Sequence, residues 1–365
     1  MSRPQTALPS VTPEVARAES VPSADTQALS RAYLTRGRMI FWLAILTLAL
    51  LVALILGSAF GSVHLDLVRA FADPSSPDRA IFTAARLPRV LMGAVVGAVL
   101  AAVGAALQAL VRNPLAEGGI LGISGGGALG AIIAMVLFAR SPFAYAIMPI
   151  AAFGAALIAT VAVYRLALVD GRLEPFTLLL VGVIFNAFWG AAIMLVNSVV
   201  NFYYAHSILF WLMGSLEAPS YREVAIVAIF AALGFAVLMA RARDMNLLSL
   251  GDESAAELGV EVESVRRAIF FATSIMIGAA VSVSGIISFV GLIVPHVLRL
   301  ALGADQRLLL PASLLGGAAF LVIADLVARV AIAPSELPVG AITALCGGPF
   351  FIYMLRRQGG KPFGL

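Results

Sequence analysis

Long apolar stretches dominate the pattern along the chain and recur from residue 39 to residue 355. About 20 apolar residues with few charges are enough for a helix to cross the hydrocarbon core of a bilayer. We therefore predict ten spanning helices, over residues 39–60, 88–111, 119–139, 143–168, 176–198, 223–241, 266–284, 286–302, 308–331 and 338–355. Gly285, Gly291 and Pro295 interrupt the seventh and eighth of these, so their boundaries are the hardest to place. A short outer helix is expected around 204–216.

Composition supports a membrane protein. The 365 residues are 61% hydrophobic and 12% charged, and the mean hydropathy is +1.00. Soluble domains carry about 25% charged residues, so half of that amount favours lipid as the solvent. The expected fold class is an all-α, polytopic integral membrane protein with about ten transmembrane helices.

The chain is predicted to have a transmembrane domain at residues 39–357 between two tails. Residues 1–38 are polar and rich in Pro, Ser, Thr and Ala, which favours a disordered cytoplasmic tail. A secretory signal would place its apolar segment close to the N-terminus, whereas about 30 polar residues come first here. Residues 358–365 form a short cytoplasmic tail.

The distribution of basic residues sets the orientation. With both termini in the cytoplasm, 17 of the 24 Lys and Arg residues fall on the inner side. Lys and Arg are enriched in cytoplasmic loops, and the reverse orientation would invert this bias.

The sequence lacks the residues that two common enzyme motifs require. Gly122-Ile-Ser124-Gly-Gly126 matches a hydrolase nucleophile elbow, but that serine needs a His and an acid within reach. Only three histidines exist, and none is expected beside it. No Gly-Lys-Ser/Thr phosphate-binding loop occurs, so the chain has no nucleotide-binding loop of its own, and any ATP that drives its action is hydrolysed by another subunit. The single cysteine, Cys346, lies in an apolar run and is expected to be a buried packing residue.

Glycines at helical spacing have a simpler explanation. Gly93-x-x-x-Gly97, Gly122-x-x-x-Gly126 and Gly126-x-x-x-Gly130 let helix backbones approach in lipid, where small residues drive packing. Lining a transport pathway is the alternative.

Charged residues inside predicted spans are few. Asp325 and Arg329 lie four residues apart on one helix face and can pair with each other. Intramembrane charges otherwise mark function, so a docking role at the outer end is the alternative for Arg329.

The inner segment 241–267 is the longest charged stretch between spans. Asp252 and Glu253 begin a short amphipathic helix that Gly259 ends, with Ala255, Ala256 and Leu258 on one side. Such a helix favours partner docking over a solvated connector.

Several blocks together resemble the permease subunits of type II ABC importers, which import ferric siderophores, haem and vitamin B12. They are Arg86-Leu-Pro-Arg89, Asn113-Pro-Leu-Ala-Glu117, Gly122-Ile-Ser124, Trp211-Leu-Met-Gly214, Leu248-Ser-Leu-Gly251, Gly291-Leu-Ile-Val-Pro295-His296 and Glu336-Leu-Pro-Val-Gly340. The blocks follow the family order over residues 86–356. One departure is Ser124-Gly125-Gly126, where the family usually has a polar residue in the middle position.

The resemblance implies a homodimer in the bacterial inner membrane, with two ATP-binding subunits below it and a periplasmic substrate-binding protein above it. ATP and Mg²⁺ are used by the partner subunit, no cofactor is expected on this chain, and no nucleic acid is involved. Transport would proceed by alternating access.

The resemblance also assigns roles to residues. The cytoplasmic gate comprises Asn113, Leu115, Glu174 and Pro175. Docking of the binding protein falls to Arg86, Arg89 and Arg329. Coupling to the ATPase falls to Leu250, Gly251, Asp252, Glu253, Ala255, Ala256, Leu258 and Gly259.

One outer segment gives an indication of the substrate. In it, Tyr203, Tyr204 and His206 are expected near the mouth of the pathway. Tyr and His are haem-iron ligands, although an aromatic belt at the membrane interface is the alternative. Haem is the first candidate, ferric siderophores the next and cobalamin the third. An ion-coupled secondary transporter is the alternative of a different class.

Overall fold

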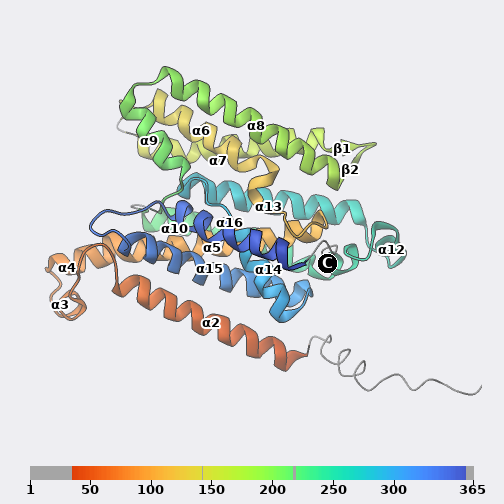
Figure 1. Ribbon diagram of the computed structural model, residues 1–365, viewed down its shortest axis with the longest axis horizontal. Helices are drawn as coiled ribbons and strands as arrows, with labels where there is room; N and C mark the ends of the chain where they lie inside the picture. The colour runs from red at the N-terminus through yellow and green to blue at the C-terminus, as the bar shows by residue number, and fades with distance from the viewer. Residues whose placement is uncertain (1–34, 142, 217–218, 359–365) are drawn as a thin grey trace, which may run out of the picture. The chain divides into compact units, whose positions relative to one another are not determined.

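The apolar stretches form helices throughout most of residues 35–141, 143–216 and 219–358, which are the residues that the computed structural model describes. Most of the predicted N-terminal tail and residues 359–365 lie outside this part of the chain. The first described element is the helix that begins at Arg36 (Figure 1).

The long helices follow the predicted order. They are α2 (Arg36–Ala59), α5 (Leu87–Leu110), α6 (Ile123–Leu137), α7 (Ala144–Leu166), α8 (Pro175–Val199), α10 (Tyr221–Ala240), α13 (Val262–Ser284), α14 (Val290–Leu302), α15 (Gln306–Val330) and α16 (Val339–Gln358). The short elements are α3 (Leu67–Ala72), α4 (Pro77–Ala80), the π-helix η1 (Ile81–Arg86), the 3₁₀-helix η2 (Gly118–Leu121), α9 (Phe202–Leu212), α11 (Ala242–Leu248) and α12 (Asp252–Glu257). Strands β1 (Leu168–Val169) and β2 (Arg172–Leu173) pair antiparallel, with Leu168 opposite Leu173.

The number of spans agrees with the prediction. Seven helices of the described residues are long and apolar enough to cross a membrane, and Ile123–Leu137, Val290–Leu302 and Val339–Tyr353 are shorter apolar helices. Together they match the ten predicted segments, and the all-α class is confirmed apart from the two-residue strands.

Helix α5 forms the centre of the fold, and most of its residues are buried. Its glycines allow two close crossings, because a Cβ on Gly97 would lie 2.3 Å from the Gly317 carbonyl oxygen of α15. On Gly104 a Cβ would lie 1.9 Å from the carbonyl oxygen of Gly291, in α14. No larger side chain fits at either crossing without moving the backbone.

Helices α6 and α7 pack by the same means. A Cβ on Gly126 would lie 2.5 Å from the Ala159 side chain, and one on Gly130 would lie 2.4 Å from that of Ala155. The prediction that glycines at helical spacing serve helix packing is confirmed for these positions.

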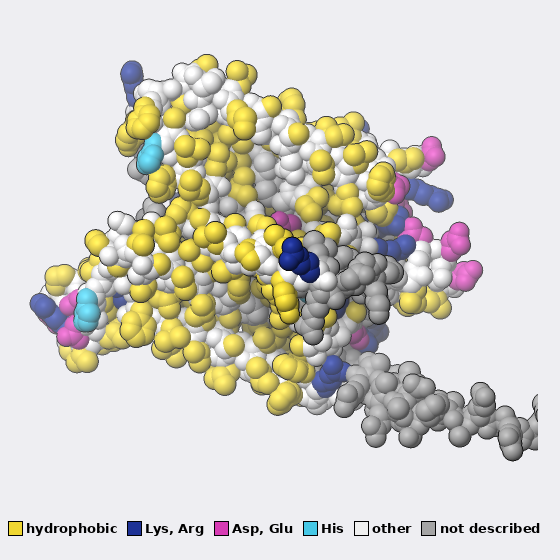
Figure 2. Space-filling view, viewed as in Figure 1, with side chains coloured by type: hydrophobic (Ala, Val, Ile, Leu, Met, Phe, Trp, Pro, Cys, Tyr) yellow, Lys and Arg dark blue, Asp and Glu magenta, His cyan; other side chains and the backbone are white. Residues whose placement is uncertain are grey.

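The surface separates apolar from charged side chains. Figure 2 shows hydrophobic side chains over the middle of this face, with most charged side chains near the ends, where α12 and the β1–β2 hairpin lie at one end and α3 and α4 at the other. Helix α8 exposes large apolar residues such as Phe188, Met194 and Leu195. An apolar exterior of this kind requires lipid or another protein around it.

Two expectations were wrong. Cys346 is exposed on α16 and is not a buried packing residue. The second span does not begin at residue 88, because α4 and η1 continue it back to Pro77.

Candidate functional site

One cavity brings together the two segments predicted to form a cytoplasmic gate. Its volume is about 570 Å³, and its walls include Asn113 and Pro114 from the loop after α5. Glu174 and Pro175, at the start of α8, form another wall. The two segments are remote in sequence, so the fold itself creates this arrangement. Leu115 lies in the same loop and is partly buried.

The loop after α5 is shaped by its own polar groups. Arg112 has a φ of 49°, in the left-handed region, where the chain turns out of α5. Next to it, the Asn113 side-chain oxygen accepts a hydrogen bond from the Leu115 N–H at 2.9 Å. The side chain of Asn113 therefore fixes the conformation of the predicted gate loop.

Glu174 caps α8 from the other wall. Its carboxylate accepts the N–H of Phe176 at 3.0 Å and also the N–H of Thr177. Burial raises the pKa of Glu174, but the hydrogen bonds from Thr177 and Phe176 and the charge of Arg266 lower the pKa by more, so it lies below its ordinary value. The carboxylate is thus held ionised at the helix N-terminus.

Helix α12 carries the residues predicted to contact an ATPase. Leu250 and Leu258 flank this helix and are 64% and 61% exposed. Glu253 and Ala256 are also exposed, whereas Gly251 has a φ of 120° and Gly259 a φ of 86°, so both glycines serve the turns around the helix. Ala255 is fully buried, so the prediction that it lies on the contact face with Ala256 and Leu258 is wrong.

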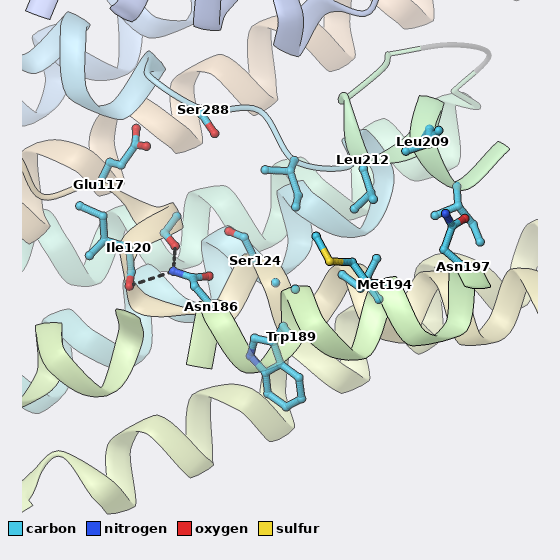
Figure 3. Close-up of a pocket in the computed structure, with 16 residues that line it drawn as sticks. Glu117, Ile120, Ser124, Asn186, Trp189, Met194, Asn197, Leu209, Leu212 and Ser288 are labelled. Atoms are coloured by element: carbon cyan, nitrogen blue, oxygen red, sulfur yellow. Dashed lines mark hydrogen bonds between the residues drawn. The ribbon is translucent and has the colours of Figure 1, made fainter. Parts of the chain in front are cut away.

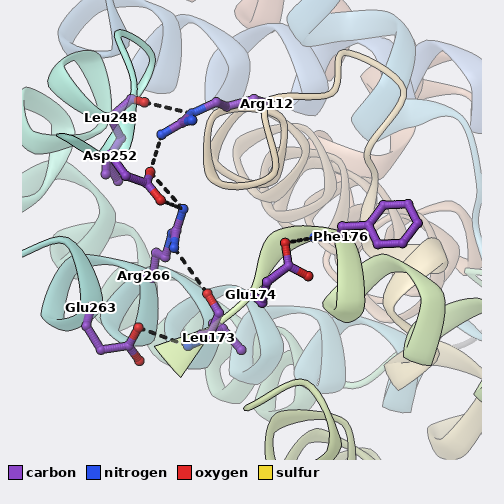
Figure 4. A network of polar contacts seen from close by, with 8 residues as sticks. All are labelled: Arg112, Leu173, Glu174, Phe176, Leu248, Asp252, Glu263 and Arg266. Atoms are coloured by element: carbon purple, nitrogen blue, oxygen red, sulfur yellow. Dashed lines mark hydrogen bonds and ion pairs between the residues drawn. The ribbon is translucent and has the colours of Figure 1, made fainter. Parts of the chain in front are cut away.

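Asp252, the first residue of α12, is half-buried and makes its contacts within the chain. Its carboxylate pairs with Arg112 and Arg266, and Arg266 also donates a hydrogen bond to the Leu173 carbonyl oxygen (Figure 4). The sequence did not single out Arg112 or Arg266. A signal was present in the position of Arg112 next to Asn113, but its partner lies 140 residues away.

At the other end of α5, the three arginines predicted to dock a binding protein face inward. The Arg86 guanidinium donates to the carbonyl oxygens of Ala59 at 2.9 Å and Val63 at 2.7 Å. The Arg329 guanidinium donates to those of Gly57 and Phe60, both at 3.0 Å. Both arginines are buried, so they hold the end of α2 and the loop that follows it.

Arg89 joins these residues to two carboxylates. It lies 2.9 Å from Asp325 and 2.6 Å from Glu336. The predicted pair of Asp325 with Arg329 is confirmed at 2.9 Å. Burial raises the pKa of Glu336, but the hydrogen bond from Ser62 and the charges of Arg89 and Arg329 lower the pKa by more, so it lies below its ordinary value. Among the charged residues of this cluster, Arg89 and Glu336 keep the largest exposed fractions of their side chains, at 12% and 24%.

A second cavity, of about 520 Å³, lies between α6, α8 and α9 (Figure 3). Its polar lining residues are Glu117, Ser124, Asn186, Trp189, Asn197 and Ser288. Asn186 donates to the carbonyl oxygens of Gly119 and Ile120, which line the same space. Gly125 also lines it, and a Cβ there would come within 3.0 Å of the Trp189 ring. The absence of a side chain at position 125 therefore lets Trp189 of α8 pack close to α6 at this wall of the cavity.

The predicted substrate-binding aromatic residues lie on α9 but do not line that cavity, whose α9 lining is Ile208, Leu209 and Leu212. Tyr203 is 74% exposed and packs edge-on against Tyr204. The ring of His206 lies 4.7 Å from that of Phe210. Across the described part of the chain, no three His, Cys, Asp or Glu side chains come together as a metal-binding group.

Comparison with known proteins gives a consistent result. The sequence model of the FecCD transport family matches residues 45–357. The cobalamin import system permease protein BtuC of Halobacterium salinarum is 46% identical, over 75% of this chain and 72% of that protein. The hemin transport system permease protein HmuU of Yersinia pestis is 42% identical, over 85% of this chain and 94% of that protein.

A solved structure supports the fold. It is described as an inward-facing conformation of a metal-chelate type ABC transporter and is 29% identical to this chain. The TM-score is 0.76, and the match covers 87% of this chain and 99% of that one.

Proposed function

Because the chain belongs to the FecCD transport family, we propose that it moves an iron chelate from a periplasmic binding protein to the cytoplasm by alternating access. The chain is the permease subunit of a type II ABC importer, and ATP is hydrolysed by a partner subunit. Haem is the first candidate for the chelate and a ferric siderophore the next.

The observation that carries this proposal is the 570 Å³ cavity between the two predicted gate segments. Alternating access needs a constriction that opens on one side while the other is closed. Asn113 and Leu115 on the loop after α5, and Glu174 and Pro175 at the start of α8, can form that constriction if the two segments move together or apart. Local hydrogen bonds fix the conformation of each segment, so each can move as a unit.

The 520 Å³ cavity suits a pathway for a large chelate. Apart from Glu117, its polar lining groups are uncharged, and the remaining lining is glycine or apolar. Passage requires contacts weak enough for release, and neutral groups beside apolar walls provide such contacts. High affinity then belongs to the binding protein.

The outer end supports a docking role for loops held by the arginines. Arg86 and Arg329 fix the segment Gly57–Val63, and Arg89 fixes the Glu336 loop. We propose that these loops form the surface on which the periplasmic binding protein rests. The three arginines then act by shaping this surface, with Arg89 the most accessible of them.

The apolar exposed face of α8 favours a second copy of the chain as its neighbour, which gives the homodimer that the proposed pathway requires. At the inner end, exposed Leu250 and Leu258 beside acidic Glu253 favour contact with the ATP-binding subunit, one on each copy. Solvated connectors do not gain by exposing leucines at both ends of a short helix.

Relatives of this chain are named for cobalamin, hemin and Fe³⁺-citrate. Tyr203, Tyr204 and His206 favour haem, because their side chains are of the types that bind haem iron and stack on its ring. Cobalamin is the third candidate, supported by the uncharged amides of Asn186 and Asn197 in the cavity.

Replacement of Tyr203, Tyr204 and His206 by Ala should lower haem uptake into proteoliposomes about tenfold, the effect of losing roughly 1.4 kcal/mol of contact free energy. Cyanocobalamin uptake should not change. Phe71→Ala, which removes another exposed aromatic side chain at the outer end, is the control and should leave haem uptake unchanged. Normal haem uptake by the triple variant would show that these residues take no part in substrate recognition. If the unmodified protein took up cyanocobalamin and not haem, cobalamin would be the substrate.

A further inference from the structure

The carboxylate of Asp252 lies between two guanidinium groups that come from different parts of the chain. Arg266, near the start of α13, contacts both carboxylate oxygens, at 2.8 and 2.6 Å. Arg112, two residues after the end of α5, contacts one of the same oxygens. A single side chain of α12 therefore joins α5 to α13 (Figure 4).

Each arginine continues into a predicted gate segment. Arg112 is the residue before Asn113, and its Nε donates to the Leu248 carbonyl oxygen at 2.8 Å. Arg266 donates to the Leu173 carbonyl oxygen at 3.2 Å, and Leu173 is the residue before Glu174. The Leu173 N–H is held as well, by the Glu263 carboxylate at 2.9 Å. The network therefore extends from α12 to the residue that adjoins each gate segment.

The exposure of these groups indicates what the network can do. The side chain of Asp252 is 44% exposed and that of Arg112 is 34% exposed, so water screens their attraction and they add little to stability. The Arg266 side chain is 9% exposed, and its Nη2 contacts both carboxylate oxygens of Asp252 while its Nη1 donates to the Leu173 carbonyl oxygen, so the guanidinium is held from two sides. The network therefore matters for the relative positions of these groups and not for the stability of the fold.

We propose that Asp252, together with Arg112 and Arg266, transmits the movement of α12 to both gate segments at once. The inference rests on the proposed contact of α12 with the ATP-binding subunit. When that subunit displaces α12, the carboxylate moves both guanidinium groups, and through them the backbone at Arg112 and Leu173. These three residues are positioning residues, since they act through the gate segments and not on the substrate.

The alternative is that Asp252 only anchors α12 to the rest of the chain. Anchoring predicts that its loss weakens binding of the ATP-binding subunit or the folded yield. Transmission predicts that both are kept, while the substrate transported for each ATP hydrolysed falls. The ratio of transport to hydrolysis therefore separates the two roles.

The test uses Asp252→Asn, which removes the charge and keeps the shape. In proteoliposomes with the ATP-binding subunit and the binding protein, uptake for each ATP hydrolysed should fall fivefold or more, at the lower end of typical couplings between sites. Asp252→Glu keeps the charge and should recover most of the ratio. Asp244→Asn removes another carboxylate–arginine pair at the same end, Asp244 with Arg241, and is the matched control that should leave the ratio unchanged.

A second variant covers the case in which Asp252→Asn does not reach the membrane. Arg112→Gln leaves the pair of Asp252 with Arg266 in place and should lower the ratio on its own. In the double variant the two effects should not add, because both act on one contact. Haem, cyanocobalamin and a ferric hydroxamate siderophore serve as the transported probes.

The outcomes are distinct. If the unmodified protein transports none of the three probes with ATP, the proposed function fails, whatever the variants do. If it transports one of them and Asp252→Asn keeps the ratio of uptake to hydrolysis, the transmission role is overturned. Loss of binding of the ATP-binding subunit by Asp252→Asn also overturns it, in favour of anchoring.

Discussion

Replacing both Leu250 and Leu258 by Asp is expected to abolish binding of the ATP-binding subunit while the permease remains folded. Both leucines are more than half exposed, so neither contributes to the core. Burial of one leucine side chain in an interface is worth about 1.5–3 kcal/mol, so losing two weakens binding by on the order of 100-fold or more. The introduced charges add a desolvation penalty at the contact.

The measurement is the affinity of the ATP-binding subunit for the permease in lipid nanodiscs. Val169→Asp, which alters an exposed apolar residue on the β1–β2 hairpin, is the control and should bind normally. Undiminished binding by the double leucine variant would mean that α12 is not the contact.

The second large effect is expected for Arg329→Glu, which should prevent the outer end from folding. The Arg329 side chain is 4% exposed, pairs with Asp325 at 2.9 Å and donates to two carbonyl oxygens of the segment Gly57–Phe60. Breaking a buried ion pair destabilises by about 3–5 kcal/mol. A glutamate there would also place two carboxylates side by side.

The yield of monodisperse protein in detergent and its melting temperature report this effect. Arg222→Glu reverses a charge on an exposed residue at the start of α10 and should change neither quantity. If Arg329→Glu melted like the unmodified protein and lost only the stimulation of ATP hydrolysis by the binding protein, Arg329 would be a direct docking residue and not a structural one.

The sequence predicts the helices well because lipid leaves few alternatives. In a bilayer every backbone N–H and C=O must be satisfied within the segment, so a long apolar run becomes a helix. The second span was nevertheless predicted to start at 88, whereas the helical segment begins at Pro77. The structure continues the helix back through η1, whose wider turn bonds the Leu87 N–H to the Phe82 carbonyl oxygen just before Pro88. Sequence periodicity does not reveal a π turn.

Whether a contact in the candidate sites could be predicted depends on how far apart its two residues lie in the sequence. Asp325 and Arg329 are one helical turn apart, so their pair could be predicted. Arg89 lies 236 residues from Asp325, and Arg112 lies 140 from Asp252, so only the fold brings them together. The same limit applies to the arginines predicted to dock the binding protein. The motif predicts their place at the outer end, but their inward direction depends on carbonyl groups at the end of α2 and just after it.

Ala255 illustrates a further limit. A helix of six residues has too few apolar positions to define which face is buried, so Ala255 and Ala256 looked equivalent in the sequence. In the structure the first is buried and the second is exposed. Leu250 and Leu258, which flank the helix, are the exposed large apolar residues there.

The most direct test of the central claim is ATP-driven uptake in proteoliposomes that contain this permease, its ATP-binding subunit and its binding protein. We predict that haem, a ferric siderophore or cobalamin accumulates in the proteoliposomes only when Mg²⁺ and ATP are present on the side of the ATP-binding subunit. Uptake that needs no ATP-binding subunit and follows an imposed proton or sodium gradient would contradict the account, because the chain would then be an ion-coupled secondary transporter.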